Sequence, residues 1–172
     1  GALEYIEFEE QLLRRAGDLL RATPNEVPDR IERLSEQVRA LQDELRGLKA
    51  KEAVSKAGEL AGLAERGVLV ARVDHFGTAE LKQLAQETVR ALGSGVVALV
   101  GAADGKAAIA VAISKDLVAR GAAADAIARP AVQQLGGGVG KGAEAVVGGG
   151  QNVAGIDDAL AVARELAAQW GS

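Results

Sequence analysis

Residues 96–113 read VVALVGAADGKAAIAVAI, two apolar runs divided by Asp104 and Gly105. An Asp-Gly pair between apolar runs is a strong signal for the tight turn of a β-hairpin, because both turn positions need a positive φ. The first run, residues 96–102, is apolar throughout, so we expect a central strand that is covered on both faces. The second run, residues 107–113, is predicted to pair with it.

Outward from this hairpin, strands and helices are expected to alternate over residues 67–172. Thr78 and Gly93 bracket a helix over residues 79–92, with Thr78 as its N-terminal cap and Gly93 as its stop. Pro130 is expected to strain or break the helix that contains it. The pattern predicts a small α/β sandwich with a mixed sheet. Its other elements are a strand at 68–73, a helical turn at 115–120, helices at 122–135 and 157–170, and a short strand at 143–147.

Residues 1–66 are dense in charge and follow a helical period. A first helix over residues 3–21 ends at the tetrapeptide TPNE, residues 23–26, which has the signature of a capping box. We therefore expect a hinge near residues 22–28, after which a second helix runs from Pro28 into the fifties.

The second helix carries a seam of apolar residues at alternating spacings of three and four, the a and d positions of a coiled coil. Two arrangements would bury this seam: a hairpin with the first helix, or pairing with a second copy of the chain. The predicted fold class is therefore α+β, a helical hairpin or coiled-coil stalk followed by the sandwich. The seam residues are Ile31, Leu34, Val38, Leu41, Leu45 and Leu48.

Composition argues against several classes of site. The chain has no cysteine and one histidine, so disulfides, thiolate metal sites and a histidine-rich metal site are not expected. Aromatic residues make up 2% of the chain, which limits base stacking, and a net charge of −4 provides no basic arm for nucleic acid. No apolar run reaches the length of a membrane span, and we expect a cytoplasmic protein without a membrane partner.

Residues 135–152 read LGGGVGKGAEAVVGGGQN, in which eight of eighteen residues are glycine. The stretch does not fit a P-loop, because Lys141 is followed by Gly142 rather than by a hydroxyl residue. Nor does it fit a dinucleotide-binding fingerprint, since it follows a predicted helix rather than a strand. Glycine permits close approach to the backbone, so the stretch is either a flexible surface loop or a backbone-lined surface for an anionic or polar ligand.

Two stretches occur in a familiar order: LLRRAGDLLRATPNEVPDRIERLSEQVRALQDEL at residues 12–45 and GGGVGKGAEAVVGGG at residues 136–150. This order resembles the C-terminal domain of bacterial alanyl-tRNA synthetases, and the globular half is similar to the DHH-associated domain of a group of phosphoesterases. The family's glycine motif reads like GGGGGGRPDMAQAGG. Lys141 stands in place of its arginine, and within residues 142–146 only Ala145 agrees. The matching glycines are Gly136, Gly137, Gly138, Gly140, Gly148 and Gly149.

The resemblance implies a noncatalytic module that holds the tRNA elbow, where the D and T loops meet. Such a module helps the aminoacylation and editing sites of the synthetase to share one alanine-specific tRNA. The resemblance implies no cofactor here, because ATP and zinc belong to upstream domains. It also implies that the helical part can form a homodimer, and the globular unit is a second surface through which two copies could pair. The alternative function is an assembly domain with little RNA affinity of its own.

The predicted tRNA-binding surface is the glycine stretch, with Lys141 as its cation. Folded RNA is recognised largely through its shape, its 2′-OH groups and its phosphates, so exposed cations elsewhere in the globular half are further candidates. Charge alone selects Arg72, Lys106, Lys115, Arg120 and Arg129.

Overall fold

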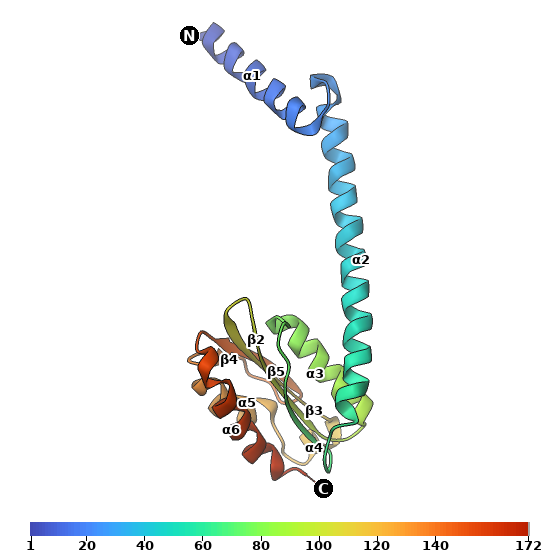
Figure 1. Cartoon of the computed structure of the whole chain (residues 1–172), viewed down its shortest axis with the longest axis vertical. Coiled ribbons are helices and arrows are strands. Elements are labelled where there is room, and N and C mark those ends of the chain that lie inside the picture. The colour runs from blue at the N-terminus through green and yellow to red at the C-terminus, as the bar shows by residue number, and fades with distance from the viewer. Residues whose placement is uncertain (172) are drawn as a thin grey trace. The chain divides into compact units, whose positions relative to one another are not determined.

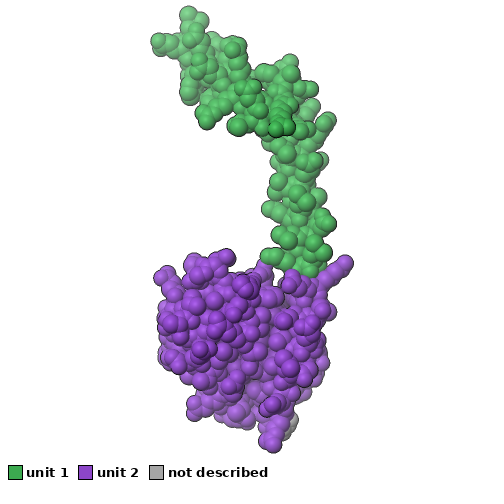
Figure 2. Space-filling view, in the orientation of Figure 1, with its two compact units in different colours: residues 1–49 green, residues 50–172 purple. Residues whose placement is uncertain are grey.

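The computed structural model describes residues 1–171, which form two compact units divided between Lys49 and Ala50. Figure 1 labels the elements and Figure 2 colours the two units. The helices are α1 (Ala2–Leu20), α2 (Val27–Ala61), α3 (Thr78–Leu92), α4 (Lys115–Ala119), α5 (Ala124–Gln134) and α6 (Ile156–Ala168), with short 3₁₀ turns η1 (Pro24–Glu26) and η2 (Val153–Gly155). The strands are β1 (Val68–Arg72), β2 (Val96–Ala103), β3 (Lys106–Ile113), β4 (Gly138–Val139) and β5 (Ala145–Gly150).

The first unit contains α1, η1 and the beginning of α2. Between the two helices, the Glu26 carboxylate accepts hydrogen bonds from the backbone N–H of Thr23 at 2.9 Å and from the Thr23 hydroxyl at 2.6 Å. One short turn over Pro24–Glu26 precedes the restart of the helix at Val27. Pro28 falls in the first turn of α2, where a missing N–H costs no hydrogen bond. The chain thus changes direction at the tetrapeptide that carries the capping signature.

The apolar seam of α2 lies open to solvent in this unit. Its side chains keep between 39% and 64% of their surface exposed. Helix α1 also exposes apolar side chains, among them Leu3 and Leu19 at 78% each, so it does not cover the seam. The internal hairpin, one of the two arrangements expected from the sequence, is therefore not formed. Although α2 is long, neither it nor another helix within residues 1–171 is apolar enough to cross a membrane.

The second unit is built on a five-stranded sheet of order β1-β2-β3-β5-β4. Strand β1 runs parallel to β2 and the other neighbours are antiparallel, so the sheet is mixed, as predicted. Strands β2 and β3 form the predicted hairpin, in which Val96 pairs with Ile113. Asp104 and Gly105 have φ values of 51° and 74°, and positive values at both positions are what a tight hairpin turn requires.

Helices cover both faces of the β2–β3 hairpin. On one face, Val97 and Leu99 pack in a cluster with Leu84 of α3. On the other face, Val100 packs in a cluster with Ile127 of α5 and with residues of α6. Figure 1 shows α3 on one side of the sheet and α5 and α6 on the opposite side. This arrangement explains why the two strands are apolar at every inner position.

The end of α2 belongs to the second unit. Ala53, Ala57 and Leu60 are buried in the cluster that also contains α3. The second compact unit therefore begins at Ala50, whereas the sequence composition predicted a domain boundary between residues 66 and 67. The exposed face of this helix is rich in charged residues. Average composition therefore does not reveal the narrow apolar stripe that packs into the second unit.

The second glycine triplet is part of the sheet and not of a loop. Strand β5 pairs with β3 on one side and with β4 on the other, so the short strand expected at residues 143–147 begins later and continues through the glycines. A side chain would not fit at its end, because a Cβ on Gly150 would overlap the carbonyl oxygen of Leu135. These glycines let neighbouring backbones approach closely.

Helix α5 continues through Pro130, so the break, one of the two effects expected from the sequence, does not occur. The proline removes a hydrogen bond to the carbonyl of Ala126, four residues earlier. Ala126 is exposed, so water can replace the missing N–H donor. The carbonyl that loses its hydrogen bond faces water, and the helix therefore stays intact.

We expect Gly150→Ala to lower the free energy of unfolding by about 1–3 kcal/mol, because the new methyl group overlaps the Leu135 carbonyl inside a paired strand. The matched control is Gly138→Ala, where a Cβ meets no atom within 4 Å and the expected change is below about 0.5 kcal/mol. Urea unfolding followed by circular dichroism measures both. Equal losses in the two variants would contradict the packing role of β5.

Candidate nucleic-acid interface

The sheet brings some of the predicted cations together and separates others. One end, which we call the Lys115 end, is where β3 finishes, β5 begins and residues 140–144 connect β4 to β5. Lys141 lies in that connection. Lys115 is the first residue of the short helix α4 that follows β3, and Arg120 comes directly after this helix. Three of the six candidate cations therefore share this end.

The other candidate cations lie elsewhere. Arg72 ends β1 and Lys106 follows the β2–β3 turn, so both belong to the opposite end of the sheet, which we call the hairpin end. Arg129 lies in the middle of α5. The six candidate cations, Lys141 from the motif and five from charge, therefore do not form one continuous patch.

The glycine stretch divides into an exposed part and a structural part. Gly148 and Gly149 pair with residues of β3 and β4, so their backbone is surrounded by the sheet and is not a free surface. The prediction that they belong to a backbone-lined loop is wrong. Gly138 and Gly140 differ, because a Cβ on either would meet no atom within 4 Å. These two glycines lie at the outer edge of the sheet, where a ligand can come close to the peptide.

The other two predicted glycines shape the approach to that edge. Gly136 follows α5 with a φ of +67°, a conformation that favours glycine. Gly137 is closed on one side, since a Cβ there would overlap the carbonyl oxygen of Gly149. The accessible part of the motif is therefore the segment from Gly138 to Lys141.

The cations at the Lys115 end have no acidic partner among residues 1–171. Lys115, Arg120 and Lys141 are exposed, and none forms an ion pair within the described part of the chain. A cation that is not neutralised by a neighbour can release counterions and bind a phosphate. Their shared location makes this end the best candidate for contact with an anionic polymer.

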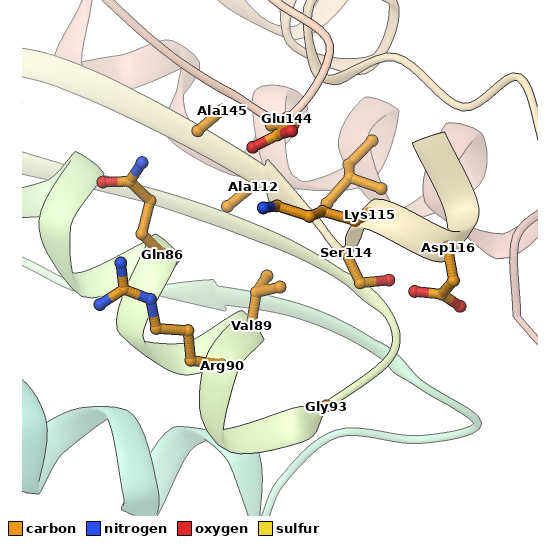
Figure 3. A pocket seen from close by; sticks show the side chains of 11 residues that line it. Gln86, Val89, Arg90, Gly93, Ala112, Ser114, Lys115, Asp116, Glu144 and Ala145 are labelled. Carbon is orange, nitrogen blue, oxygen red and sulfur yellow. The ribbon is translucent and has the colours of Figure 1, made fainter. Parts of the chain in front are cut away.

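A hollow of about 430 Å³ lies beside Lys115, between α3 and the ends of β3 and β5. Figure 3 shows Gln86, Arg90 and Lys115 around it, with Val89 and Ala112 at its base. Gln86 and Arg90 were not among the residues predicted from the sequence. Their spacing of four on the exposed side of a predicted helix was the one available signal, and it does not identify the strand ends that complete the hollow.

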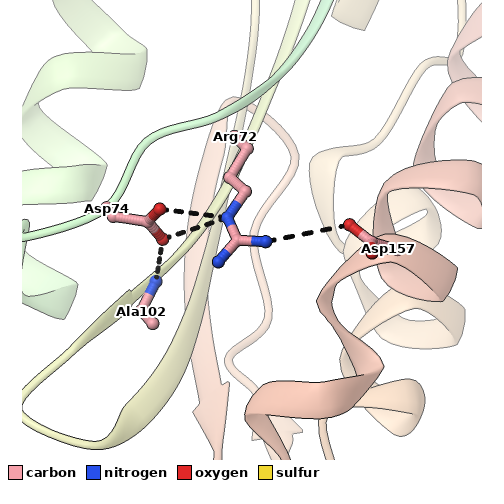
Figure 4. Close-up of polar contacts among 4 residues, drawn as sticks. All are labelled: Arg72, Asp74, Ala102 and Asp157. Atoms are coloured by element: carbon pink, nitrogen blue, oxygen red, sulfur yellow. Dashed lines mark hydrogen bonds and ion pairs between the residues drawn. The ribbon is translucent and has the colours of Figure 1, made fainter.

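Arg72 is engaged in contacts within the domain (Figure 4). Its Nε lies 3.0 Å and 3.2 Å from the two carboxylate oxygens of Asp74, and another guanidinium nitrogen lies 3.8 Å from Asp157. Asp74 also accepts a hydrogen bond of 2.9 Å from the backbone N–H of Ala102, which joins the end of β1 to β2. Arg129 is similarly paired, 3.2 Å from Asp125. Both arginines are less suited to phosphate than the unpaired cations.

The hydrogen bond from Ala102 N–H, followed by that from Arg72, holds the pKa of Asp74 below its usual range. A carboxylate with a lowered pKa in the folded state stabilises the fold above the unfolded pKa, and this stability is lost as the pH falls through the folded pKa. We expect Asp74→Asn to lower stability at pH 7, with the difference from the parent shrinking below about pH 4. Urea unfolding at pH 7, 5 and 3 measures this, with Asp158→Asn as the control, and a constant difference across that range would contradict the assignment.

No protein-family model matches the chain. The chain is 39% identical over 172 residues to an alanine–tRNA ligase of Anaeromyxobacter dehalogenans, an alignment that covers 98% of this chain and 19% of that protein. It is 34% identical over 167 residues to an alanine–tRNA ligase of Acetivibrio thermocellus, covering 93% of this chain and 19% of that protein. The chain thus spans about a fifth of the length of these relatives.

Among solved structures, the C-Ala domain from Aquifex aeolicus alanyl-tRNA synthetase superposes with a TM-score of 0.52 and 21% sequence identity. The superposition covers 58% of this chain and 89% of that domain, which shows a shared fold. The similarity in sequence extends over nearly the whole chain, and the α+β fold is the one expected from the resemblance. The chain is therefore a relative of the C-terminal region of the alanine–tRNA ligases, with the fold of the C-Ala domain.

Proposed function

We propose that this chain is a noncatalytic, tRNA-binding module of an alanyl-tRNA synthetase. The observation that carries the proposal is the similarity to alanine–tRNA ligases over 98% of the chain. The unpaired cations of the Lys115 end supply a physical means of binding. They give the module a local positive surface although the chain as a whole has a net charge of −4.

The part of the tRNA that fits this surface best is its elbow, where two loops join into a compact corner. A folded RNA presents phosphates and 2′-OH groups rather than open base edges, so recognition depends on shape and on charge. Gly138 and Gly140 offer bare peptide at the sheet edge next to Lys141, and a rounded RNA backbone can approach it closely. Holding the elbow leaves the acceptor end free, so the aminoacylation and editing sites of the synthetase can share one tRNA.

We expect Lys115→Glu to weaken the binding of alanine-specific tRNA by about tenfold or more, because it places a negative charge among the phosphate contacts. The matched control is Lys106→Glu, which makes the same change in charge at the hairpin end and is expected to have a smaller effect. Fluorescence anisotropy with transcribed tRNA measures both. For about three phosphate contacts, the logarithm of the parent affinity should fall with the logarithm of salt concentration with a slope of about −3.

Two results would contradict the proposal. One is an equal loss of affinity in Lys106→Glu and Lys115→Glu, which would mean that binding is not localised. The other is equal affinity for intact tRNA and for an unstructured RNA of the same length. A minihelix that lacks the D loop tests the elbow itself, and it should bind more weakly than the whole tRNA.

A second candidate function, assembly of two copies, is favoured by the exposed seam of α2. Ile31 and Val38 occupy a positions and Leu34 and Leu41 occupy d positions. In a parallel coiled coil, β-branched residues at a with leucine at d favour two strands. The seam side chains are 39% to 64% exposed in the single chain, which leaves their apolar surface available to a partner. Assembly and tRNA binding are compatible, because the seam and the Lys115 end belong to different units.

If the seam pairs two copies, sedimentation equilibrium at micromolar concentration should give about twice the chain mass of 17.6 kDa. Leu41→Glu should then return the mass to that of one chain, because a charge at a d position is buried in the pair. Ala40→Glu, one residue away and outside the seam, is the matched control and should remain dimeric. A parent chain that sediments as a monomer would exclude assembly through this seam.

A further inference from the structure

We propose that the hollow beside Lys115 receives one unpaired nucleotide, with a base that carries an exocyclic amino group. The inference rests on the proposed RNA-binding function and assigns a ligand to a particular site within it. The hollow is lined by α3, the end of β3, the start of α4 and the start of β5, all within the second unit. Its volume of about 430 Å³ lies within the range of small-ligand sites.

The base of the hollow is apolar. Val89, Ala112 and Ala145 line the space, together with Ile113 at the end of β3 (Figure 3). A planar base can lie on this floor and lose contact with water on one face. The site lacks an aromatic ring, so the base is held by aliphatic contact and by the polar groups at its rim rather than by stacking.

Two cations stand at the rim in reach of a nucleotide's phosphate. Lys115 has no acidic partner among the described residues, and Arg90 pairs only with Glu87, at 2.7 Å. The Arg90 side chain is 73% exposed, and an exposed pair of this kind contributes little to stability, so the guanidinium can exchange Glu87 for a phosphate. The two groups come from different elements, α3 and α4, on either side of the hollow (Figure 3).

Two other groups of the rim, Gln86 and Glu144, can read a base edge. The Glu144 carboxylate accepts hydrogen bonds, and the Gln86 amide both donates and accepts them. A carboxylate acceptor favours cytosine, adenine or guanine, whose exocyclic amino groups donate, over uracil, which has none. The amino-base preference follows from Glu144.

Asp116 is a second carboxylate of the hollow, and serine hydroxyls hold it in place. Its carboxylate accepts a hydrogen bond of 2.6 Å from the Ser94 hydroxyl, and Figure 3 shows it beside Ser114. Hydrogen bonds from the hydroxyls of Ser114 and Ser94 hold the pKa of Asp116 below its usual range, so it remains ionised in this position. The charged and amide groups that line the hollow are therefore two cations, Arg90 and Lys115, two carboxylates, Asp116 and Glu144, and the amide of Gln86.

The hollow is continuous with the proposed tRNA surface. Glu144 follows Lys141 by three residues in the connection between β4 and β5, and Lys115 contributes to both sites. An RNA chain that passes the glycine edge at Lys141 can thus place a nucleotide into the hollow. Loop nucleotides in folded RNA are the ones free to leave their stack and enter such a site.

The test is a titration of the whole chain with nucleoside 5′-monophosphates, followed by ¹H–¹⁵N correlation spectra. We expect CMP, AMP or GMP to shift the amide signals of Gln86, Lys115 and Glu144 at millimolar concentration, with UMP binding at least about threefold more weakly. Gln86→Glu should raise the dissociation constant by about fivefold or more, because the new carboxylate repels phosphate and competes for Arg90. Gln83→Glu is the matched control, with the same change in charge on the same helix outside the hollow, and should leave binding unchanged.

Several outcomes overturn the inference: no shifts at saturating nucleotide, shifts centred on Lys106 instead, or equal loss in Gln83→Glu and Gln86→Glu. Equal binding of UMP and CMP overturns the amino-base preference. A second measurement, the affinity for tRNA, separates the two proposals. If tRNA binds and mononucleotides do not, the nucleotide site fails while the proposed function stands. If mononucleotides bind in the hollow and tRNA does not, the proposed function fails.

Discussion

The structure of the second unit depends on burying both faces of the β2–β3 hairpin. Val97 and Leu99 point to one face and Val96 and Val100 to the other, and all four are fully buried. Two strands of this kind are stable in water only if a layer of helix lies on each side. Helix α3 and the end of α2 form one layer, and α5 and α6 form the other. The remaining strands extend a sheet whose centre is already enclosed.

The same constraint explains the two uses of glycine. Strand β5 lies against the central hairpin, and Gly148 to Gly150 sit where the backbones of β3, β4 and the end of α5 come together. Side chains are excluded there for reasons of packing. At the outer edge, Gly138 and Gly140 meet open space, and packing does not account for the absence of a side chain. The glycine stretch therefore has two parts: Gly148 to Gly150 serve packing, and Gly138 and Gly140 are open to a ligand.

Local signals explain which elements could be predicted from the sequence. The Asp104–Gly105 turn and the flanking runs define the hairpin without reference to distant residues, and Gly93 ends α3 as expected. The strand character of Gly148 to Gly150 was not predictable, because glycine favours loops until a neighbouring backbone makes it necessary. The hollow was equally hidden. Gln86, Lys115 and Glu144 are distant in sequence, and only the order of strands in the sheet brings them together.

The distribution of charge decides which end of the sheet an anionic ligand meets. At the hairpin end, Arg72 lies between Asp74 and Asp157, so its field is largely cancelled at short range. At the Lys115 end, Asp116 is bound to Ser94, and Lys115, Arg120 and Lys141 have no acidic partner within residues 1–171. Physiological salt screens charges beyond roughly 8 Å, so a phosphate responds to these neighbours rather than to the net charge. A negative net charge therefore does not by itself prevent an anionic ligand from meeting unpaired cations at the Lys115 end.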